Sequence, residues 1–195
     1  MKNKVYLLCV LAFVFVLAAC GNSDESEEQN DAGKQVEEQV INEDGLAKPK
    51  TVDFHNSEEE KIGTAELKET SEGVDVKVKA SDLPEGEHGF HFHEKAACEA
   101  PTFESAGSHY NPTGSEHGLT HGSGPHAGDL PNLTVAEDGT VEAEFTAEMV
   151  TLDKSGETSL LKEGGTALVI HEKADDGKSQ PSGDSGNRLA CAVID

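Results

Sequence analysis

The amino-acid sequence predicts an all-β domain that folds as an antiparallel sandwich or barrel. Three observations support this class. Apolar and polar residues alternate with a period of two in several short runs, turn-forming clusters separate these runs, and no stretch has the apolar spacing of a long amphipathic helix. The alternation indicates half-buried antiparallel strands, because successive side chains of a strand point to opposite faces.

Two runs show the alternation most clearly. From Gly73 onward, three valines alternate with charged residues, and from Thr140 to Phe145 apolar residues alternate with glutamates. Further strands are expected at Lys61–Glu69, Glu87–Glu94, Thr166–Glu172 and Arg188–Ile194. The turn clusters that separate the strands include Pro84-Glu85-Gly86, Glu137-Asp138-Gly139 and Gly164-Gly165.

Two long segments, 95–133 and 173–187, interrupt this rhythm of strands and turns. Long loops in a compact domain are usually functional or disordered. The first loop has few apolar residues to hold it in place, but it contains three histidines and an aspartate. We therefore expect a bound metal ion to order this loop, so that metal binding and loop order are linked.

The N-terminal segment, residues 1–19, has the features of a signal peptide. Two lysines precede a thirteen-residue apolar run, which is short for a membrane-spanning helix but typical of an export signal. The run ends in Leu17-Ala18-Ala19-Cys20, which resembles a bacterial lipobox and implies cleavage before Cys20 and attachment of lipid to it. An ordinary secretory peptide is the alternative. Because several acyl chains give stable anchoring, we expect a lipid anchor on the extracytoplasmic face of a cell membrane.

Residues 20–50 are expected to be an acidic, disordered linker that carries the lipidated Cys20. The stretch 21–50 contains nine acidic residues, three lysines and no aromatic residue. Such a composition cannot bury enough apolar surface to offset its chain entropy. The remaining segment, 51–195, is about 145 residues long, which is enough for one domain with a single core.

The charge of the chain excludes one class of partner. The formal net charge is −23, and it becomes −25 once Lys2 and Lys4 leave with the signal peptide. Nucleic acid is excluded as a partner, because its recognition depends on basic stripes. The sequence also lacks a P-loop, a GxGxxG motif and a nucleophile elbow.

Two cysteines, Cys98 and Cys191, remain in the domain after processing. An even pair of cysteines in an exported chain predicts a disulfide. Two free thiols or two thiolate metal ligands are the alternative, but the short Cys-x-x-Cys spacing of zinc thiolate sites is absent.

Seven potential metal ligands occur within 81 positions, in an order that suits two ions. Alternation within a strand places His91 and His93 on one face, while Phe90 and Phe92 point to the other. Three imidazoles and a carboxylate suit a tetrahedral zinc site, whereas an all-imidazole set suits copper. The other candidates are His109, His117, His126, Asp129 and His171.

These residues lie in motifs that resemble the copper-zinc superoxide dismutase family, and the resemblance covers the whole domain after the linker. The motifs are GFHFHEK (89–95), SAGSHYNP (105–112), PHAGDLPN (125–132), LVIHEKADD (168–176) and GDSGNRLAC (183–191). The resemblance implies an eight-stranded antiparallel Greek-key fold with two long functional loops. It also implies one copper ion and one zinc ion per chain.

The resemblance further assigns a role to each residue. Copper is bound by His91, His93, His109 and His171, and zinc by His109, His117, His126 and Asp129. His109 bridges the ions and carries a proton, Asp175 hydrogen-bonds His91 and His117, and Arg188 guides the anionic substrate. Cys98 and Cys191 match the intrachain disulfide of the family.

The activity that the resemblance implies is dismutation of superoxide to dioxygen and hydrogen peroxide. A domain this acidic should repel an anion, so we expect a positive mouth formed by Arg188 with Lys173 or Lys178. The loop between His171 and Arg188 has only sixteen residues, and Ser182 is a candidate to line the entrance.

The sequence leaves alternatives for the function and the assembly of the domain. A non-catalytic metal store on the same fold is the main rival to an enzyme, and a surface adhesion domain is a weaker one. The family includes dimers and monomers, so a homodimer is one of the options. His55, His88 and His121 have no counterpart among the ligands.

Overall fold

The computed structural model describes residues 45–195, which form nine strands and one short 3₁₀ helix, η1 (Glu104–Ala106). The strands are β1 (Lys50–Asn56), β2 (Lys61–Thr70), β3 (Gly73–Ala80), β4 (Gly86–His88), β5 (Phe90–His93), β6 (Leu133–Val135), β7 (Val141–Ala147), β8 (Thr166–His171) and β9 (Arg188–Ile194). Within this part of the chain, no helix is long and apolar enough to span a membrane.

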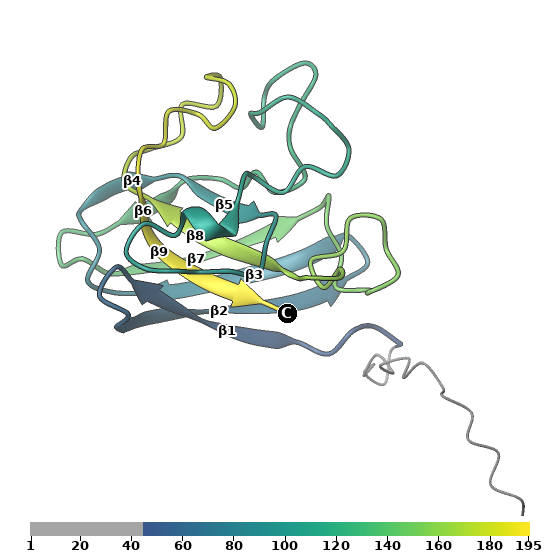
Figure 1. The fold of residues 1–195 in the computed structure, drawn as a ribbon, viewed down its shortest axis with the longest axis horizontal. Helices are drawn as coiled ribbons and strands as arrows, with labels where there is room; N and C mark the ends of the chain where they lie inside the picture. Colours follow the sequence, from purple (N-terminus) through teal and green to yellow (C-terminus); the bar gives the residue numbers. More distant parts are fainter. Residues whose placement is uncertain (1–44) are drawn as a thin grey trace, which may run out of the picture. The chain divides into compact units, whose positions relative to one another are not determined.

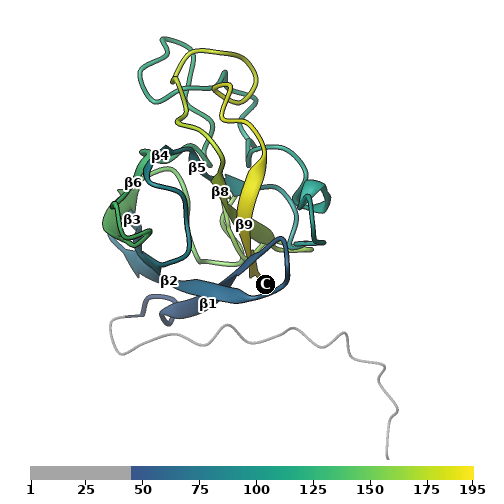
Figure 2. The same cartoon turned by 90° about the vertical axis from the view of Figure 1, so that its left-hand side faces the viewer.

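Seven strands form one antiparallel sheet in the order β5-β8-β9-β1-β2-β3-β7, and β4 and β6 form a separate antiparallel pair. The large sheet curls into a half-barrel, as the two views in Figures 1 and 2 show. The all-β prediction is confirmed, and so is the expectation that turns, not helices, connect the strands.

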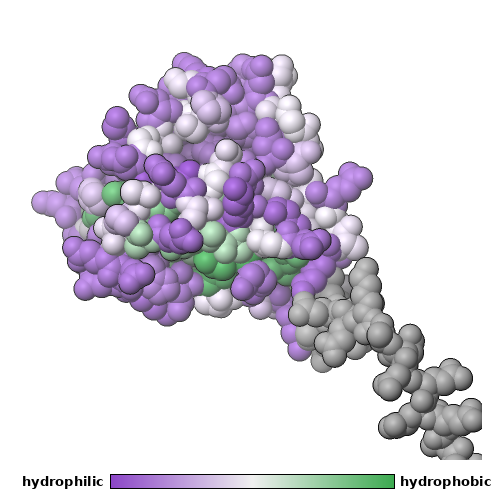
Figure 3. Space-filling view, viewed as in Figure 1, coloured by the Kyte–Doolittle hydropathy of each residue, from purple (hydrophilic) through white to green (hydrophobic). Residues whose placement is uncertain are grey.

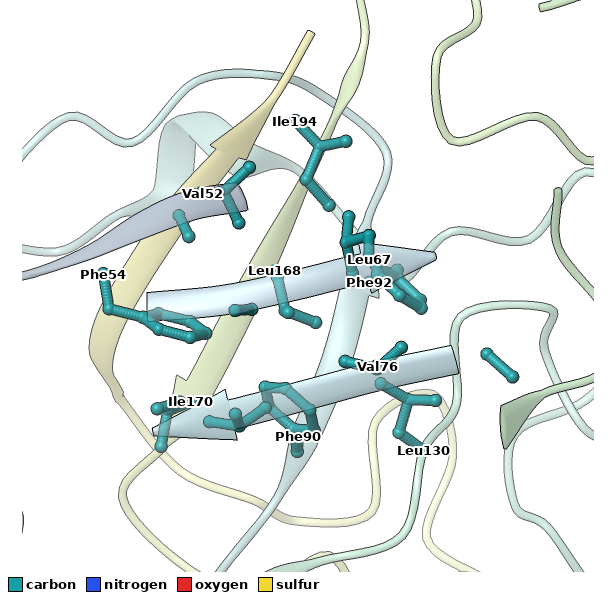
Figure 4. Close-up of a cluster of buried hydrophobic side chains, with 14 of the residues drawn as sticks. Val52, Phe54, Leu67, Val76, Phe90, Phe92, Leu130, Leu168, Ile170 and Ile194 are labelled. Carbon is teal, nitrogen blue, oxygen red and sulfur yellow. The ribbon is translucent and has the colours of Figure 1, made fainter. Parts of the chain in front are cut away.

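The interior of the half-barrel is filled by every second side chain of its strands. In β3, Val74, Val76 and Val78 are fully buried, and Val76 lies opposite Leu67 of β2 and Phe145 of β7. Figure 4 shows how the strands converge on one cluster, which includes Phe54, Leu67, Phe90, Phe92, Leu168 and Ile170. Burial of each such side chain stabilises the fold by about 1.5–3 kcal/mol.

The predicted strand Glu87–Glu94 is interrupted at Gly89, which explains why nine strands are present where eight were expected. The Gly89 N–H donates to the carbonyl of Lys173 (2.7 Å), and the Gly89 carbonyl accepts from the N–H of His171 (2.8 Å). The chain therefore leaves its pairing with β6 and joins β8. A Cβ at Gly89 would lie 2.9 Å from the Cβ of Ser185, so this crossing has no room for a side chain.

The folded chain also begins earlier than the predicted boundary at Thr51. Lys50 already opens β1, and Ala47 is buried in the core. The expected signal peptide (1–19), the lipidated Cys20 and the linker up to residue 44 lie outside the described residues.

A third long segment, 148–165, was not recognised from the sequence. Leu152 and Leu160 within it are fully buried in the core. The segment is fixed by hydrogen bonds from the Tyr110 hydroxyl to the carbonyl of Ser159 (3.0 Å) and from the Thr166 hydroxyl to the carbonyl of Leu160 (2.9 Å). The apolar residues Val150, Leu152 and the pair Leu160-Leu161 are too few and too widely spaced to give a sustained strand or helix period, so the sequence pattern does not indicate this segment.

The predicted pairing of Cys98 with Cys191 is confirmed, with 5.6 Å between their Cα atoms. The disulfide ties the loop after β5 to the outer face of β9. Around it lies a small second apolar cluster that includes Phe103, Ala106, Ala167 and Val169.

The two long loops predicted from the sequence rise from the same end of the half-barrel. In both ribbon views, residues around 110–125 and 174–186 extend side by side beyond the strands (Figures 1 and 2). The face drawn in Figure 3 is mostly hydrophilic, with one apolar band near the level of β1 and β9. The loop end of the fold is where the candidate ligands gather.

Candidate metal centre

The first group of ligands stands on two paired strands and one loop. Because β5 alternates, Phe90 and Phe92 enter the core while His91 and His93 face the loops. His171 ends β8, the neighbour of β5, and His109 comes from the loop, whose backbone is bridged to His93. One ligand atom from each of these four buried histidines lies within 4.8 Å of the others.

The second group comes from the loop itself. His109, His117, His126 and Asp129 are all buried, and one ligand atom of each lies within 4.8 Å of the others. The Asp129 carboxylate is 3.0 Å from Nδ1 of His109, 3.1 Å from Nδ1 of His117 and 3.3 Å from Nδ1 of His126. The Asp129 carboxylate also accepts the backbone N–H groups of Gly118 (2.9 Å) and His126 (3.1 Å), which fixes its orientation.

Hydrogen bonds determine which ring nitrogen of each histidine in the first group is free to bind an ion. Nδ1 of His93 is 3.0 Å from the carbonyl of Gly107, and Nδ1 of His171 is 3.2 Å from the hydroxyl of Ser185. If these Nδ1 atoms carry the protons, both Nε2 atoms present bare lone pairs, and they face each other at 3.3 Å. Two facing lone pairs repel, so a cation bound by both is the arrangement that these rings fit.

Other buried nitrogens point to the same conclusion. Nε2 of His91 and Nε2 of His117 donate to the two oxygens of Asp175, at 2.7 and 2.9 Å, so in the neutral form of each ring Nδ1 carries no proton and is free to bind an ion. Unpaired buried polar atoms are rare in native proteins, and a site for an ion is a standard reason for them. The buried ring nitrogens without a hydrogen-bond partner are His91 Nδ1, His109 Nε2, His117 Nδ1 and His126 Nδ1. The residues present therefore fit two metal ions.

His109 belongs to both groups. Its Nδ1 faces Asp129, and its unpaired Nε2 faces the first group. The ring also stacks on His91 with 3.9 Å between centroids. A single imidazole thus presents one nitrogen to each candidate ion.

The electrostatics of the first ligand group favour neutral imidazoles, and the carboxylates of the site are ionised; these are the forms that bind metals. Burial lowers the pKa of His171 to about 2 and that of His109 to about 4. His117 differs: burial acts to lower its pKa, but the hydrogen bonds to Asp129 and Asp175 outweigh it and raise the pKa to about 9, so an ion must displace a proton from this ring. Partial burial acts to raise the pKa of Asp175, but the hydrogen bonds from His117 and His91 outweigh it and hold that pKa well below its usual range.

Several residues that support the ligands were not recognised from the sequence. Asn132 holds the backbone of Asp175 in both directions: its amide donates to the Asp175 carbonyl and its side-chain oxygen accepts the Asp175 N–H, each at 2.9 Å. Asn132 ends the motif PHAGDLPN (125–132), but its partner Asp175 is 43 positions away, so no local sequence pattern indicates the contact. Ser185, beside His171, and Gln180, beside His117, were missed for the same reason.

A cavity of about 410 Å³ opens at the first ligand group and is lined by His93, His109, His171 and Arg188 among others. The guanidinium of Arg188 donates to the carbonyls of Phe103 and Gly107, which fix it at the wall of the cavity. Among residues 45–195, Arg188 is the only lysine or arginine that lines this cavity, so the expected contribution of Lys173 or Lys178 to its wall is not found. Ser182 does line it, and so does the carboxylate-bearing Glu94.

The three remaining histidines lie outside both ligand groups, as expected. His88 is buried, with its ring nitrogens 2.7 Å from the carbonyl of His171 and 2.8 Å from that of Pro84. His121 lies in the loop, 3.4 Å from the carboxylate of Glu116, and His55 is exposed on β1.

Replacement of Gly183 by alanine is expected to disrupt the site. A Cβ at Gly183 would lie 2.0 Å from Oδ1 of Asp175 and 2.8 Å from Nε2 of His117, so it would push the carboxylate off the ring. Gly177 is a matched control, because its φ of +67° is close to the +69° of Gly183, but a Cβ there meets nothing within 4 Å. Both variants strain the backbone by about 1 kcal/mol. Zinc titration should show weaker binding for Gly183→Ala alone; equal loss in both variants would contradict the argument.

Comparison with known proteins identifies the family. Residues 61–194 match the family described as copper/zinc superoxide dismutase. The chain belongs to this family. It is therefore an oxidoreductase of the copper/zinc superoxide dismutase type, and the family resemblance of the motifs is confirmed.

Similar proteins come from several bacteria. Over 140 residues, 71% of this chain and 82% of the relative, the chain is 51% identical to "Superoxide dismutase [Cu-Zn] 2" of Aquifex aeolicus. It is 38% identical to a "superoxide dismutase-like protein" of Bacillus subtilis over 194 residues, which cover 98% of this chain and 96% of the relative.

Solved structures agree with the fold of this copper/zinc superoxide dismutase family member. A superoxide-dismutase-like protein from Bacillus subtilis superposes with a TM-score of 0.72 at 42% identity, covering 74% of this chain and 97% of that one. The copper/zinc superoxide dismutase of Brucella abortus superposes with a TM-score of 0.64 at 29% identity, covering 76% of this chain and all of that one.

Proposed function

We propose that this chain dismutes superoxide to dioxygen and hydrogen peroxide at a histidine-bridged site that holds one copper ion and one zinc ion. The observation that carries the proposal is the position of His109, whose two ring nitrogens face two different ligand groups. Two separate storage sites would not require a shared ring.

The donor atoms distinguish the two ions. Copper suits the all-imidazole group, through Nδ1 of His91 and Nε2 of His93, His109 and His171. Zinc suits the group that adds a hard carboxylate, Asp129, to Nδ1 of His109, His117 and His126. When bound, copper supplies one-electron redox chemistry, and zinc supplies a fixed positive charge that orders the loop.

The residues of the chain have defined tasks in this proposal. Nε2 of His109, on the cavity side, would carry a proton only while it is not bound to copper and would pass that proton to the reduced oxygen species, with water supplying the second proton of the peroxide. Its Nδ1 stays oriented by the second group throughout. Arg188 attracts the anion to the cavity and holds it near His109. Asp175 keeps His91 and His117 in the tautomers that leave their Nδ1 atoms free.

The strongly acidic composition does not prevent capture of an anion. Exposed charges beyond a Debye length of about 8–10 Å are largely screened, so the local lining decides. Arg188 is the only basic side chain of that lining and Glu94 is an opposing acid, while copper, when bound, would add positive charge at the histidines. Substrate capture is therefore expected to depend more on this single arginine than on the net charge.

Replacement of Arg188 by alanine is expected to lower the second-order rate with superoxide by about tenfold at low salt and to flatten its salt dependence. Arg188→Lys keeps the charge but not the fork that grips two carbonyls, so its rate should be intermediate. Pulse radiolysis at several ionic strengths measures both quantities. Lys178→Ala is the control, because Lys178 does not line the cavity. An Arg188→Ala rate equal to wild type at low salt would disprove the guidance role.

Metal content measured together with activity tests the proposal as a whole. Equimolar copper and zinc, with peroxide formed only when superoxide is supplied, is the expected result. One zinc with no copper and no activity would favour the rival function, a non-catalytic metal store. His109→Ala should abolish activity if the shared ring is essential.

We further propose that the domain acts outside the cell, tethered through lipid on Cys20, that superoxide and the membrane are its partners, with a homodimer as an option, and that it does not bind nucleic acid. The apolar run that ends in Leu17-Ala18-Ala19-Cys20 supports the anchor. Recovery of the mature protein in the soluble fraction without lipid on Cys20 would refute this location, and gel filtration of the domain determines its oligomeric state.

A further inference from the structure

Gln180, in the short loop between β8 and β9, grips the backbone of the candidate zinc ligand His117. The Gln180 Oε1 atom accepts the N–H of His117, and Gln180 Nε2 donates to the carbonyl of His117, both at 2.9 Å. A second contact from Nε2, to the carbonyl of Lys178 at 3.3 Å, keeps the amide turned toward His117. The two residues are 63 positions apart.

This clasp is one half of a two-point hold on His117. The same loop provides Asp175, whose Oδ1 accepts from Nε2 of the His117 ring at 2.9 Å. Gln180 therefore fixes the backbone and Asp175 fixes the ring. The loops also touch closely at the next residue, since a Cβ on Gly118 would lie 2.2 Å from the carbonyl oxygen of Gly177.

Gln180 also stands next to the wall of the cavity. The two residues that follow it, Pro181 and Ser182, line the opening together with His171 and Arg188. Gln180 thus connects a ligand of the second group, through its side chain, with the rim of the cavity, through its backbone.

We propose that Gln180 is a positioning residue: it sets the backbone of His117 for zinc and at the same time fixes the cavity rim at Pro181 and Ser182. An amide suits this role because it donates and accepts at once, and because it carries no charge that would titrate. Partners of metal ligands commonly tune metal affinity, although Gln180 is exposed and water weakens its effect. The proposal rests on zinc binding by the second group.

The test compares Gln180→Met with Ser179→Ala in protein loaded with copper and zinc. Methionine keeps the length and volume of the side chain but makes neither hydrogen bond. Ser179 is the adjacent residue, and its hydroxyl bonds only within the loop, to Asp176 at 2.6 Å. We expect Gln180→Met to release zinc to a chelator about fivefold to tenfold faster than wild type, and Ser179→Ala to release it at the wild-type rate.

Two further readouts separate positioning from general loss of stability. In Gln180→Met, amide hydrogen exchange should accelerate at His117 and on both sides of Pro181, at residues 180 and 182. The core strands should keep their protection. With Co²⁺ in place of zinc, the visible bands of the ion should shift in Gln180→Met alone.

The outcomes are distinct. Zinc release and cobalt bands in Gln180→Met that match wild type would overturn the role of Gln180 and leave the proposed function intact. If the wild-type protein binds no zinc, the proposed function itself is wrong, and the role of Gln180, which rests on it, is wrong as well. Equal acceleration of exchange throughout the strands would show a loss of fold, and would also overturn the positioning role.

Discussion

Replacement of Asp175 by alanine is expected to weaken zinc binding by about 10- to 100-fold and to lower activity through both metal groups. The reason is its double contact. Its two oxygens accept from Nε2 of His91, at 2.7 Å, and from Nε2 of His117, at 2.9 Å, so one carboxylate orients a ring in each group. Without it, either ring is free to change tautomer or to rotate, and its Nδ1 is then no longer held toward the ion.

Asp176→Asn provides the matched control. Asp176 is the next residue, and its carboxylate only accepts bonds from Lys178 and Ser179 within the exposed loop. Asp175→Asn is the finer test, because the asparagine amide has only one acceptor oxygen for the two N–H donors, Nε2 of His91 and Nε2 of His117. Calorimetric zinc titration of the metal-free protein gives the affinities. Wild-type affinity in Asp175→Ala would remove Asp175 from the site, whereas weakened binding in Asp176→Asn would indicate that the whole loop had been disturbed.

The ligand residues were predictable from the sequence, but the nitrogen atoms that they present were not. Residue type and motif indicated His91, His117 and Asp129 as ligands, because few other side chains bind these metals. The free nitrogen of each ring depends on where its hydrogen-bond partner lies in the fold. The resemblance indicated Asp175 as the partner of His91, 84 positions away, but not which ring nitrogen Asp175 contacts. Such pairings arise only when the two loops meet.

The strands, too, were predictable from the sequence only in part. Alternation predicted β3 and β7, because each has one face on the core and one in water. Alternation did not predict the break at Gly89, where the His171 N–H bonds to the Gly89 carbonyl and the chain changes its pairing partner. It also did not predict segment 148–165, where Leu152 and Leu160 fill the core although their spacing matches neither a strand nor a helix. Gln180 was unpredictable for a related reason, because its partner is the backbone of His117, which any residue type would offer.

Removal of the disulfide is expected to cause the largest loss of stability. The bond joins Cys98 and Cys191 across a sequence separation of 93 residues, and the chain-entropy relation for a loop of this length gives about 4–5 kcal/mol. For a domain of this size, that loss lowers the melting temperature by roughly 10–15 °C. Cys191 is also fully buried beside Ala167 and Val169, so a free thiol there gains nothing from solvent.

The measurement is thermal unfolding of the metal-free double variant Cys98→Ala/Cys191→Ala against wild type, with chelator present. Bound metals would mask the difference, because an ion that binds only the folded state stabilises it further. Alanine is preferred to serine at position 191, since a hydroxyl there would be buried without a partner. A change of less than about 1 kcal/mol would show that the unfolded chain gains little freedom from the missing bond, and that the cluster around Phe103 holds the loop on β9 without it.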